Sequence, residues 1–216
     1  MSEIKIAIAD DHKIFRKGLI VSLRHYSQLK FVLEAENGQQ LLEGLEAAKP
    51  DVILMDLRMP IKDGIETTKY ISEKYPHIHV IVLSMHEEEK YVLHLMENGA
   101  NGYLLKSSDP LEIKKAIVEV MEKGYYLSNY VNRILLKKAH TKNQAAISLD
   151  KEVEITDKEK EVLLHICLEY TSQQIGEKMG ISARTVESIK ERLMEKCGSK
   201  NTAGLVFFAV KHNLID

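Results

Sequence analysis

Five polar residues stand at or directly after the ends of short apolar runs in the first half of the chain. They are Asp10 and Asp11, Asp56, Ser84 and Lys106, and the run before each is typical of a buried strand. If these runs are neighbouring parallel strands, the five side chains meet at the carboxyl-terminal edge of one sheet, where open α/β folds bind ligands. The spacing therefore predicts a reactive site at that edge.

The chemistry of such a site follows from its charge. Carboxylates of Asp10, Asp11 and Asp56 gathered within a few ångströms repel one another, and a hard divalent cation with oxygen ligands offsets that repulsion, so we expect Mg²⁺. A carboxylate beside Mg²⁺ can act as a nucleophile toward phosphorus. Lys106 would place a positive charge, and Ser84 a hydrogen bond, on the phosphoryl oxygens. Taken singly, each residue also has an ordinary role, as a helix cap or a solvated side chain.

The elements that would position these residues alternate strand and helix from residue 1 to about 124, which is typical of βαβ units and a parallel sheet. We expect a doubly wound, five-stranded parallel sheet with strands near 4–9, 31–36, 51–56, 78–84 and 102–105. Helices are expected near 13–26, 38–48, 64–75, 87–98 and 110–123.

The second half of the chain changes character. A further helix is expected near 128–139, followed by a polar linker from His140 to Glu154. From Ile155 onward the pattern predicts helices, and Thr156 with Glu159 three residues later is typical of a capping box. At 216 residues the chain is long enough for two domains, and we expect a first domain over 1–124, a helix and linker over 125–154, and a small all-α domain over 155–216.

Two short helices within 155–216 have the outline of a helix-turn-helix, whose second helix enters the DNA major groove. The first would run from Ser172 to Gly180, and the second would be capped by Ser182. The second helix is expected to bury Val186, Ile189 and Leu193 and to leave Arg184, Glu187, Ser188, Lys190 and Glu191 outward.

Composition excludes several classes. The net charge of −2 indicates no particular partner, and the two cysteines have neither zinc-site nor disulfide-framework spacing. The sequence contains no apolar stretch of membrane-spanning length, and charged residues interrupt the amino terminus too early for a signal peptide. We therefore expect a cytoplasmic protein without membrane contact.

From Ile4 to about Gly124 the sequence resembles the receiver domain of two-component response regulators, which has a flavodoxin-like fold. The resemblance rests on Ile-Ala-Asp10-Asp11-His, Leu-Met-Asp56-Leu-Arg-Met-Pro60-x-x-Asp-Gly64, Leu-Ser84 and Gly-Tyr103-Leu-Leu-Lys106. It implies that Asp56 accepts a phosphoryl group from a sensor histidine kinase. It also implies that Asp11, Asp56 and the backbone carbonyl of Arg58 hold Mg²⁺, with Asp10 bonding through water. Ser84 and Tyr103 would form the switch pair, although Tyr103 could instead be an ordinary strand residue facing the helices.

Residues from about Ile155 to Leu214 resemble the LuxR/NarL-type DNA-binding domain, on the segments Ile155-Thr-Asp-Lys-Glu-Lys-Glu-Val-Leu163 and Thr171-Ser-Gln-Gln-Ile-Gly-Glu-Lys-Met-Gly-Ile-Ser182-Ala-Arg-Thr-Val186. The combination implies a transcriptional regulator rather than an enzyme. Such a regulator would bind promoter DNA and form a homodimer when phosphorylated. The likeness places that pairing on Leu205, Phe208 and Ala209, which could equally be internal core. The expected DNA contacts are Arg184, Thr185, Glu187, Ser188, Lys190, Glu191 and Lys196.

This chain departs from that family in charge. Residues 150–216 contain ten Lys and Arg against twelve Asp and Glu, which is unusual for a DNA-binding unit. Glu187 and Glu191 repel phosphate, although a glutamate can accept a hydrogen bond from cytosine. We therefore expect modest affinity and strong salt dependence.

Two alternatives stay open from the sequence. One is a receiver with a protein-binding helical output domain, which the two glutamates favour. The other is a phosphatase with an aspartyl nucleophile, although such enzymes usually have an acid two residues after the nucleophile, where this chain has Arg58.

Overall fold

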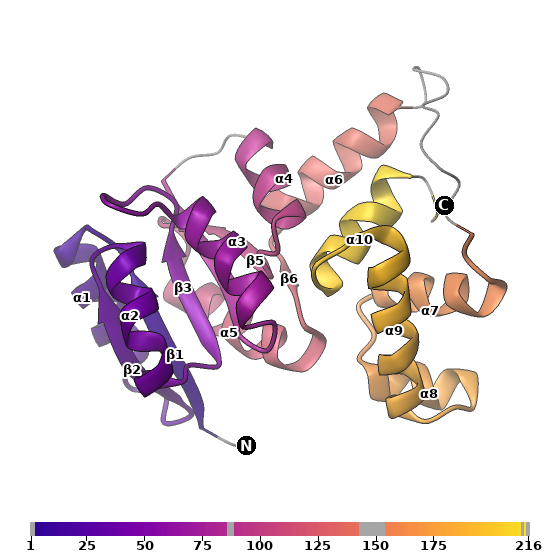
Figure 1. Ribbon diagram of the computed structural model, residues 1–216, viewed down its shortest axis with the longest axis horizontal. Helices are drawn as coiled ribbons and strands as arrows, with labels where there is room; N and C mark the ends of the chain where they lie inside the picture. Colours follow the sequence, from indigo (N-terminus) through magenta and orange to yellow (C-terminus); the bar gives the residue numbers. More distant parts are fainter. Residues whose placement is uncertain (1–2, 86–88, 143–153, 213, 215–216) are drawn as a thin grey trace.

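The computed structural model describes residues 3–85, 89–142, 154–212 and 214, and begins with an α/β unit built on a six-stranded parallel sheet (Figure 1). Its strands lie in the order β2-β1-β3-β4-β5-β6. Their bounds are β1 (Ile4–Ala9), β2 (Leu29–Ala35), β3 (Val52–Asp56), β4 (His79–Ser84), β5 (Gly102–Leu105) and β6 (Tyr126–Leu127). The expected doubly wound parallel sheet is therefore confirmed.

Helices cover both faces of this sheet. They are α1 (Lys13–Leu23), α2 (Gly38–Ala48), α3 (Gly64–Lys74), α4 (Glu89–Glu97) and α5 (Pro110–Lys123). Apolar side chains of α1 and α5 form one buried cluster with β1, β3 and β4, and those of α2, α3 and α4 pack on the other face. Because both faces are covered, the central strands consist almost entirely of buried apolar residues.

The sheet has one strand more than the sequence predicted. The sixth strand, β6, is only two residues long and pairs with β5 through Gly102 and Tyr103. Gly124 ends α5 with a φ of 85°, which turns the chain back toward the sheet edge. A two-residue strand leaves no periodicity in a sequence, so pattern analysis had no signal for it.

The second half is helical, with α6 (Asn129–Lys142), α7 (Asp157–Cys167), α8 (Ser172–Met179), α9 (Ala183–Cys197) and α10 (Thr202–Lys211). The expected linker was placed too early, because α6 continues to Lys142, and residues 143–153 of that linker lie outside the described residues. The first residues of the helix expected over 87–98 also lie outside them, and α4 is described from Glu89.

The predicted helix caps are confirmed in this half. Thr156 and Glu159 form a capping box at α7, and Ser182 caps α9 by accepting from the backbone N–H of Thr185. A second capping box, which the sequence analysis missed, joins Thr171 and Gln174 at α8. Three capped helix starts fix where each helix begins and therefore which side chains face inward.

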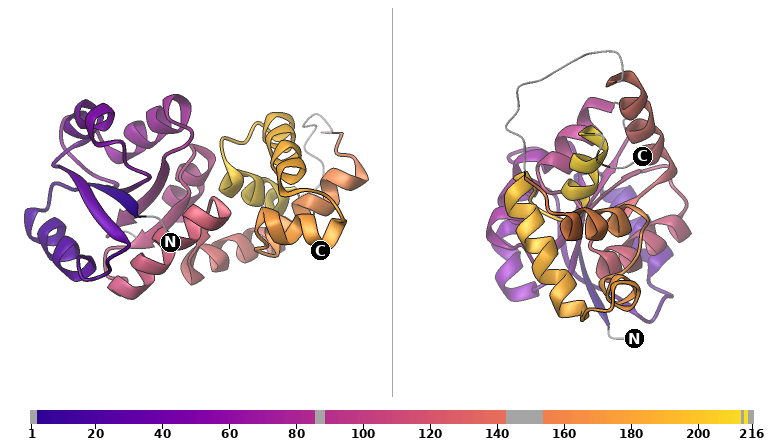
Figure 2. Two further views of the ribbon diagram at one scale, coloured as in Figure 1. Left: turned by 90° about the horizontal axis from the view of Figure 1, so that it is seen from below. Right: turned by 90° about the vertical axis from the view of Figure 1, so that its right-hand side faces the viewer.

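Helix α10 packs on its own helical domain and also on α4 and α6 (Figures 1 and 2). The Asn201 side chain, just before α10, donates to the carbonyl oxygens of Gly99 and Ala100 at 2.7 and 3.2 Å. Tyr125, whose pKa is raised mainly by burial, donates its hydroxyl to the carbonyl of Ile166 in α7. A hydrophobic cluster continues from the α4 face of the sheet into α7, α9 and α10.

Two expectations drawn from composition can be compared with the structure. In the described part of the chain, no helix has the length and apolar character needed to cross a membrane. Cys167 and Cys197 are free thiols, and burial raises the pKa of Cys167 to about 12 and that of Cys197 to about 11. Both thiols are therefore protonated and poorly reactive at neutral pH.

Gly64 holds the start of α3 against the end of β3. A Cβ atom at this position would lie 2.0 Å from the carbonyl oxygen of Asp56, and the Gly64 N–H donates to the Leu57 carbonyl at 3.1 Å. A side chain here would therefore push on the residue that ends β3.

We predict that Gly64→Ala lowers the free energy of unfolding by about 1–3 kcal/mol, because the added methyl group has only backbone to displace. Urea denaturation followed by circular dichroism measures this. Gly18→Ala is the matched control, since nothing lies within 4 Å of a Cβ there, and it should be neutral or stabilising by up to about 1 kcal/mol. Equal stability of the Gly64→Ala protein and the wild type would contradict the close approach.

Candidate functional site

The predicted cluster of polar residues forms at the carboxyl-terminal edge of the sheet. Asp10 and Asp11 follow β1, and Asp56 ends the adjacent strand β3, which pairs with β1 up to Ala9 and Met55. Lys106 follows β5, and its side chain reaches back across the edge to both acids. Strand order reverses between β1 and β3, which is where such sheets form ligand sites.

A buried lysine joins two buried carboxylates. Asp10 is 1% exposed, Asp56 5% and Lys106 7%. The Lys106 ammonium lies 2.7 Å from Asp10 Oδ2 and 2.8 Å from Asp56 Oδ2. The backbone N–H of Lys106 donates to the Ser84 carbonyl at 2.7 Å, which anchors the lysine to the end of β4. One positive charge thus faces two negative charges.

The pKa of Asp56 is raised above its ordinary value. Burial is the main cause, and the nearby charge of Asp10 acts in the same direction. The Lys106 ammonium and a hydrogen bond from the Arg58 backbone N–H partly oppose the rise. A further cation in the pocket would favour the ionised carboxylate, which is the form that can attack phosphorus.

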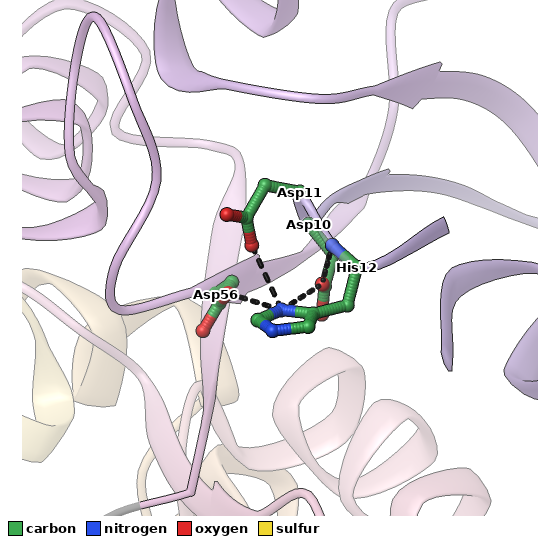
Figure 3. Close-up of side chains that lie close together, drawn as sticks. All are labelled: Asp10, Asp11, His12 and Asp56. Carbon is green, nitrogen blue, oxygen red and sulfur yellow. Dashed lines mark hydrogen bonds and ion pairs between the residues drawn. The ribbon is translucent and has the colours of Figure 1, made fainter. Parts of the chain in front are cut away.

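The donor atoms in this pocket fit a divalent cation. Oxygen atoms of Asp10, Asp11 and Asp56 and a nitrogen of His12 all lie within 4.8 Å of one another (Figure 3). Carboxylates are the ligands that Mg²⁺ prefers, so the predicted acids suit it. His12 was missed by the sequence analysis, although its place directly after the two acids was a usable signal.

Ser84 and Tyr103 are both fully buried. They lie on neighbouring strands, where Ser84 pairs with Leu105 and Tyr103 with Val82. The Tyr103 ring points into the core on the α4 face, with its centroid 6.3 Å from that of Tyr130 in α6. The Tyr103 ring therefore points inward in this structure, and the role of Ser84 and Tyr103 as a switch pair stays a prediction.

The helix-turn-helix geometry depends on two glycines. A Cβ on Gly176 would lie 2.6 Å from the Ile181 carbonyl oxygen, so α8 packs closely on the turn before α9. Gly180 ends α8 with a φ of 64°, a conformation that favours glycine. Val186, Ile189 and Leu193 are buried as predicted.

Most of the side chains predicted to contact DNA lie on the outer surface of α9. Arg184, Thr185, Glu187, Ser188 and Glu191 are exposed, and so is Lys196 near the end of the helix.

Lys190 was wrongly predicted to point outward, because it is only 8% exposed. Its ammonium lies 3.1 Å from Glu187 Oε1 and 3.4 Å from Ser172 Oγ, and Ser172 also donates to Glu187. The long side chain lies against α8 because the glutamate one turn earlier and the serine of α8 both attract it.

Lys196 is exposed but is bound to its own domain. Its ammonium lies 2.7 Å from Glu159 Oε2 and 3.0 Å from the Glu154 carbonyl oxygen. That bond from Lys196 is the main reason why the pKa of Glu159 is lowered. The lysine thus ties the end of α9 to the start of α7.

Leu205 and Ala209 in α10 are completely buried, and Phe208 is partly buried. Of the two roles open from the sequence, internal core is the one that Leu205 and Ala209 have in this structure.

Comparison with known proteins gives two family matches. Residues 6–118 match the response regulator receiver domain, and residues 153–209 match the bacterial regulatory proteins of the luxR family.

The transcriptional regulatory protein DegU of Brevibacillus brevis is 33% identical over 226 residues, which cover 99% of this chain and 96% of that protein. The oxygen regulatory protein NreC of Staphylococcus aureus is 32% identical over 216 residues, covering 99% and 100%. A structure of the two-component response regulator RcsB in complex with DNA matches with a TM-score of 0.58 and 27% identity, covering 97% of this chain and 99% of that one.

The raised pKa of Asp56 predicts how stability depends on pH. A carboxyl whose pKa in the folded protein exceeds its ordinary 3.8 destabilises the fold above the folded pKa, and this effect disappears as pH falls to 3.8. Without divalent cations, Asp56→Asn should therefore melt at a higher temperature than the wild type at pH 7, and the difference should shrink toward pH 4. Calorimetry in chelator across this range measures it. A variant that is less stable at every pH would contradict the assignment.

Proposed function

Because the chain belongs to the response regulators that join a receiver domain to a LuxR-type DNA-binding domain, we propose that a sensor histidine kinase phosphorylates it on Asp56 and thereby controls its binding to promoter DNA. The receiver would comprise residues 1–124, the helix and linker 125–154, and the DNA-binding domain 155–216. The observation that carries this proposal is the buried Asp56 carboxylate held beside Asp10 and the Lys106 ammonium at the sheet edge.

The pocket supplies the parts that phosphoryl transfer needs. A carboxylate oxygen of Asp56 bonds to phosphorus, the phosphorus–nitrogen bond of the kinase's phosphohistidine breaks, and the imidazole leaves on the kinase. Asp11, Asp56 and the Arg58 backbone carbonyl would hold Mg²⁺, with Asp10 bonding through water, and the cation supplies positive charge that offsets the phosphoryl group. Lys106, which now contacts Asp56 at 2.8 Å, would bind a phosphoryl oxygen, and Ser84 would donate to another.

The structure offers a route from this pocket to the DNA-binding helices. Helix α4 follows the strand that ends at Ser84, and it packs against α10. Glu97 of α4 pairs with Lys211 of α10 at 3.2 Å, and Asn201 binds the turn after α4. A phosphoryl group adds about −1.5 to −2 charges. We propose that the resulting movement of Ser84 and α4 loosens the contact with α10 and lets the helical domain reorient on DNA.

The exposed face of α9 would contact DNA through Arg184, Thr185 and Ser188. Glu187 is tied to Lys190, which offsets its charge, so Lys190 would act by neutralising that glutamate rather than by touching phosphate. Glu191 and Lys196 would lie nearer the phosphates. Because the local positive charge is weak, two protomers on two half-sites would be needed to raise the effective concentration, which favours a homodimer.

Different observations bear on the two alternatives, which are an aspartyl phosphatase and a receiver with a protein-binding output domain. The position two residues after Asp56, where an aspartyl phosphatase usually has a second acid, holds Arg58, whose exposed guanidinium bonds to the Tyr91 hydroxyl at 3.3 Å. The acidic balance of residues 150–216 still favours a protein partner as the second candidate.

We predict that Asp56→Asn abolishes labelling by acetyl phosphate in Mg²⁺, because the amide is not a nucleophile toward phosphorus. Phosphate-affinity gel electrophoresis of the intact chain measures the labelled fraction. Asp157→Asn, an exposed aspartate at the start of α7, is the control and should be labelled like the wild type. Undiminished acid-labile phosphate on the Asp56→Asn protein would refute the assignment.

We predict that Arg184→Ala weakens binding of the beryllofluoride-treated protein to duplex DNA several-fold and reduces the slope of log affinity against log salt by about one per protomer. Fluorescence anisotropy with a labelled duplex between low and moderate salt measures both quantities. Arg24→Ala, an exposed arginine after α1, is the control and should change neither. If the wild type retains no DNA even at low salt, the protein-binding alternative is favoured instead.

A further inference from the structure

His12 occupies an unusual place beside the acidic pocket. It stands at the N-cap position of α1, where Ser, Thr, Asp or Asn usually accept a hydrogen bond from the helix, but its side chain makes no capping bond. Instead one ring nitrogen, Nδ1, faces three carboxylates (Figure 3). It lies 2.8 Å from Asp11 Oδ1, 3.5 Å from Asp10 Oδ1 and 3.9 Å from Asp56 Oδ2.

We propose that His12 is a direct nitrogen ligand of the pocket cation and makes the pocket prefer first-row transition-metal dications such as Mn²⁺ and Co²⁺ over Mg²⁺. This inference rests on the proposed function only in taking the pocket to be a cation site. It adds a ligand and a choice of metal that the carboxylates alone do not provide.

The distances suit a shared cation. Six ligands at about 2.1 Å from a metal place neighbouring donor atoms about 3.0 Å apart and opposite donors about 4.2 Å apart. The separations of 2.8, 3.5 and 3.9 Å from Nδ1 fall in or near that range, and the four donor atoms lie within 4.8 Å of one another. His12, Asp11 and Asp56 could therefore share one ion, with Asp10 bonding to it through water.

The backbone that carries His12 is well anchored. Its N–H donates to Asp10 Oδ1 at 2.8 Å, and its carbonyl accepts from the Arg16 N–H at 3.0 Å. The buried Arg16 guanidinium donates to the Asp10 carbonyl and to Glu36. The His12 side chain is nevertheless 61% exposed, so an ion can reach the nitrogen from solvent. The backbone of His12 is therefore fixed beside the acids, while its ring stays accessible to an ion.

The choice of metal follows from the chemistry of imidazole. Mg²⁺ is a hard cation that prefers oxygen ligands and keeps several waters, so replacing a water by imidazole brings it little. Co²⁺ takes an imidazole ligand more readily than Mg²⁺ does, and affinity for nitrogen-containing sites rises from Mn²⁺ to Co²⁺ along the first-row series, so the contribution of His12 should be larger for Co²⁺ than for Mn²⁺. Replacing His12 should therefore weaken Mn²⁺ and Co²⁺ binding and leave Mg²⁺ binding nearly unchanged.

The test combines spectroscopy and affinity on the full chain. With Mn²⁺ bound, pulsed electron paramagnetic resonance of the wild type should show modulation from a directly coordinated ¹⁴N nucleus, which His12→Ala should lack. Titration calorimetry should show His12→Ala losing about tenfold in Mn²⁺ affinity, with a larger loss for Co²⁺ and less than a twofold change for Mg²⁺. His25→Ala, an exposed histidine after α1, is the matched control and should behave like the wild type.

Several outcomes would overturn the inference. Absence of nitrogen modulation in the wild type, or equal losses of Mn²⁺ and Mg²⁺ affinity in His12→Ala, would show that His12 is not a selective ligand. Labelling of Asp56 by acetyl phosphate in Mg²⁺ keeps this separate from the proposed function. If labelling proceeds while His12 shows no nitrogen signal, only the His12 inference fails, and if neither metal binds the wild type, both fail.

Discussion

The constraint that governs this molecule is the neutralisation of buried negative charge at the end of the sheet. Asp10 and Asp56 are almost completely buried, and one ammonium, that of Lys106, lies within 2.8 Å of both. Removing two carboxylates from water costs several kcal/mol each unless they are paired, so the lysine is needed for the fold itself. Burial is the main cause of the raised pKa of Asp56, and the nearby charge of Asp10 adds to it, because one ammonium cannot offset two carboxylates. A cation or a phosphoryl group bound there, as proposed above, would change this balance of charge.

A series of contacts connects the charged pocket at the sheet edge to the helices of the second half of the chain. Lys106 is held by its backbone bond to Ser84, Ser84 ends the strand before α4, and α4 packs on α10. Lys106, Ser84 and the inner side chains of α4 are buried, and packed interiors transmit displacements rather than absorb them. The exposed ion pairs across the domain contact, such as Lys200 with Glu73 at 2.8 Å, are screened by solvent and add little to its stability. The contact also includes the hydrophobic cluster that continues from the α4 face into α7, α9 and α10, so the proposed movement of α4 would disturb both kinds of interaction.

Sequence reasoning found most of the fold and the pocket because both leave strong signals. Strands that are buried on both faces are continuous apolar runs, and polar residues at their ends stand out, so Asp10, Asp56, Ser84 and Lys106 could be placed before any coordinates existed. Features that depend on geometry rather than on hydrophobic periodicity were not predicted from the sequence. Helical periodicity put Lys190 outside, but a long side chain can lie back along its helix, and only the Glu187 and Ser172 positions show that it does. Hydrophobic periodicity likewise does not predict the two-residue strand β6 or the close approach at Gly176.

The burial of Lys190 reduces the positive charge that α9 can present to DNA. Lys190 is bound to Glu187, and Lys196 is bound to Glu159. Two of the basic residues of α9 are therefore paired within their own domain, which reduces the positive charge available to DNA phosphates. The positive charge left for phosphate on this helix comes mainly from Arg184 and Arg192, both exposed. Affinity for DNA scales steeply with the number of phosphates neutralised, so a single copy of this domain would bind weakly. Joining two copies raises affinity without adding charge, because the second contact becomes intramolecular. The homodimer proposed above would therefore matter more for this chain than for a DNA-binding domain with more positive charge.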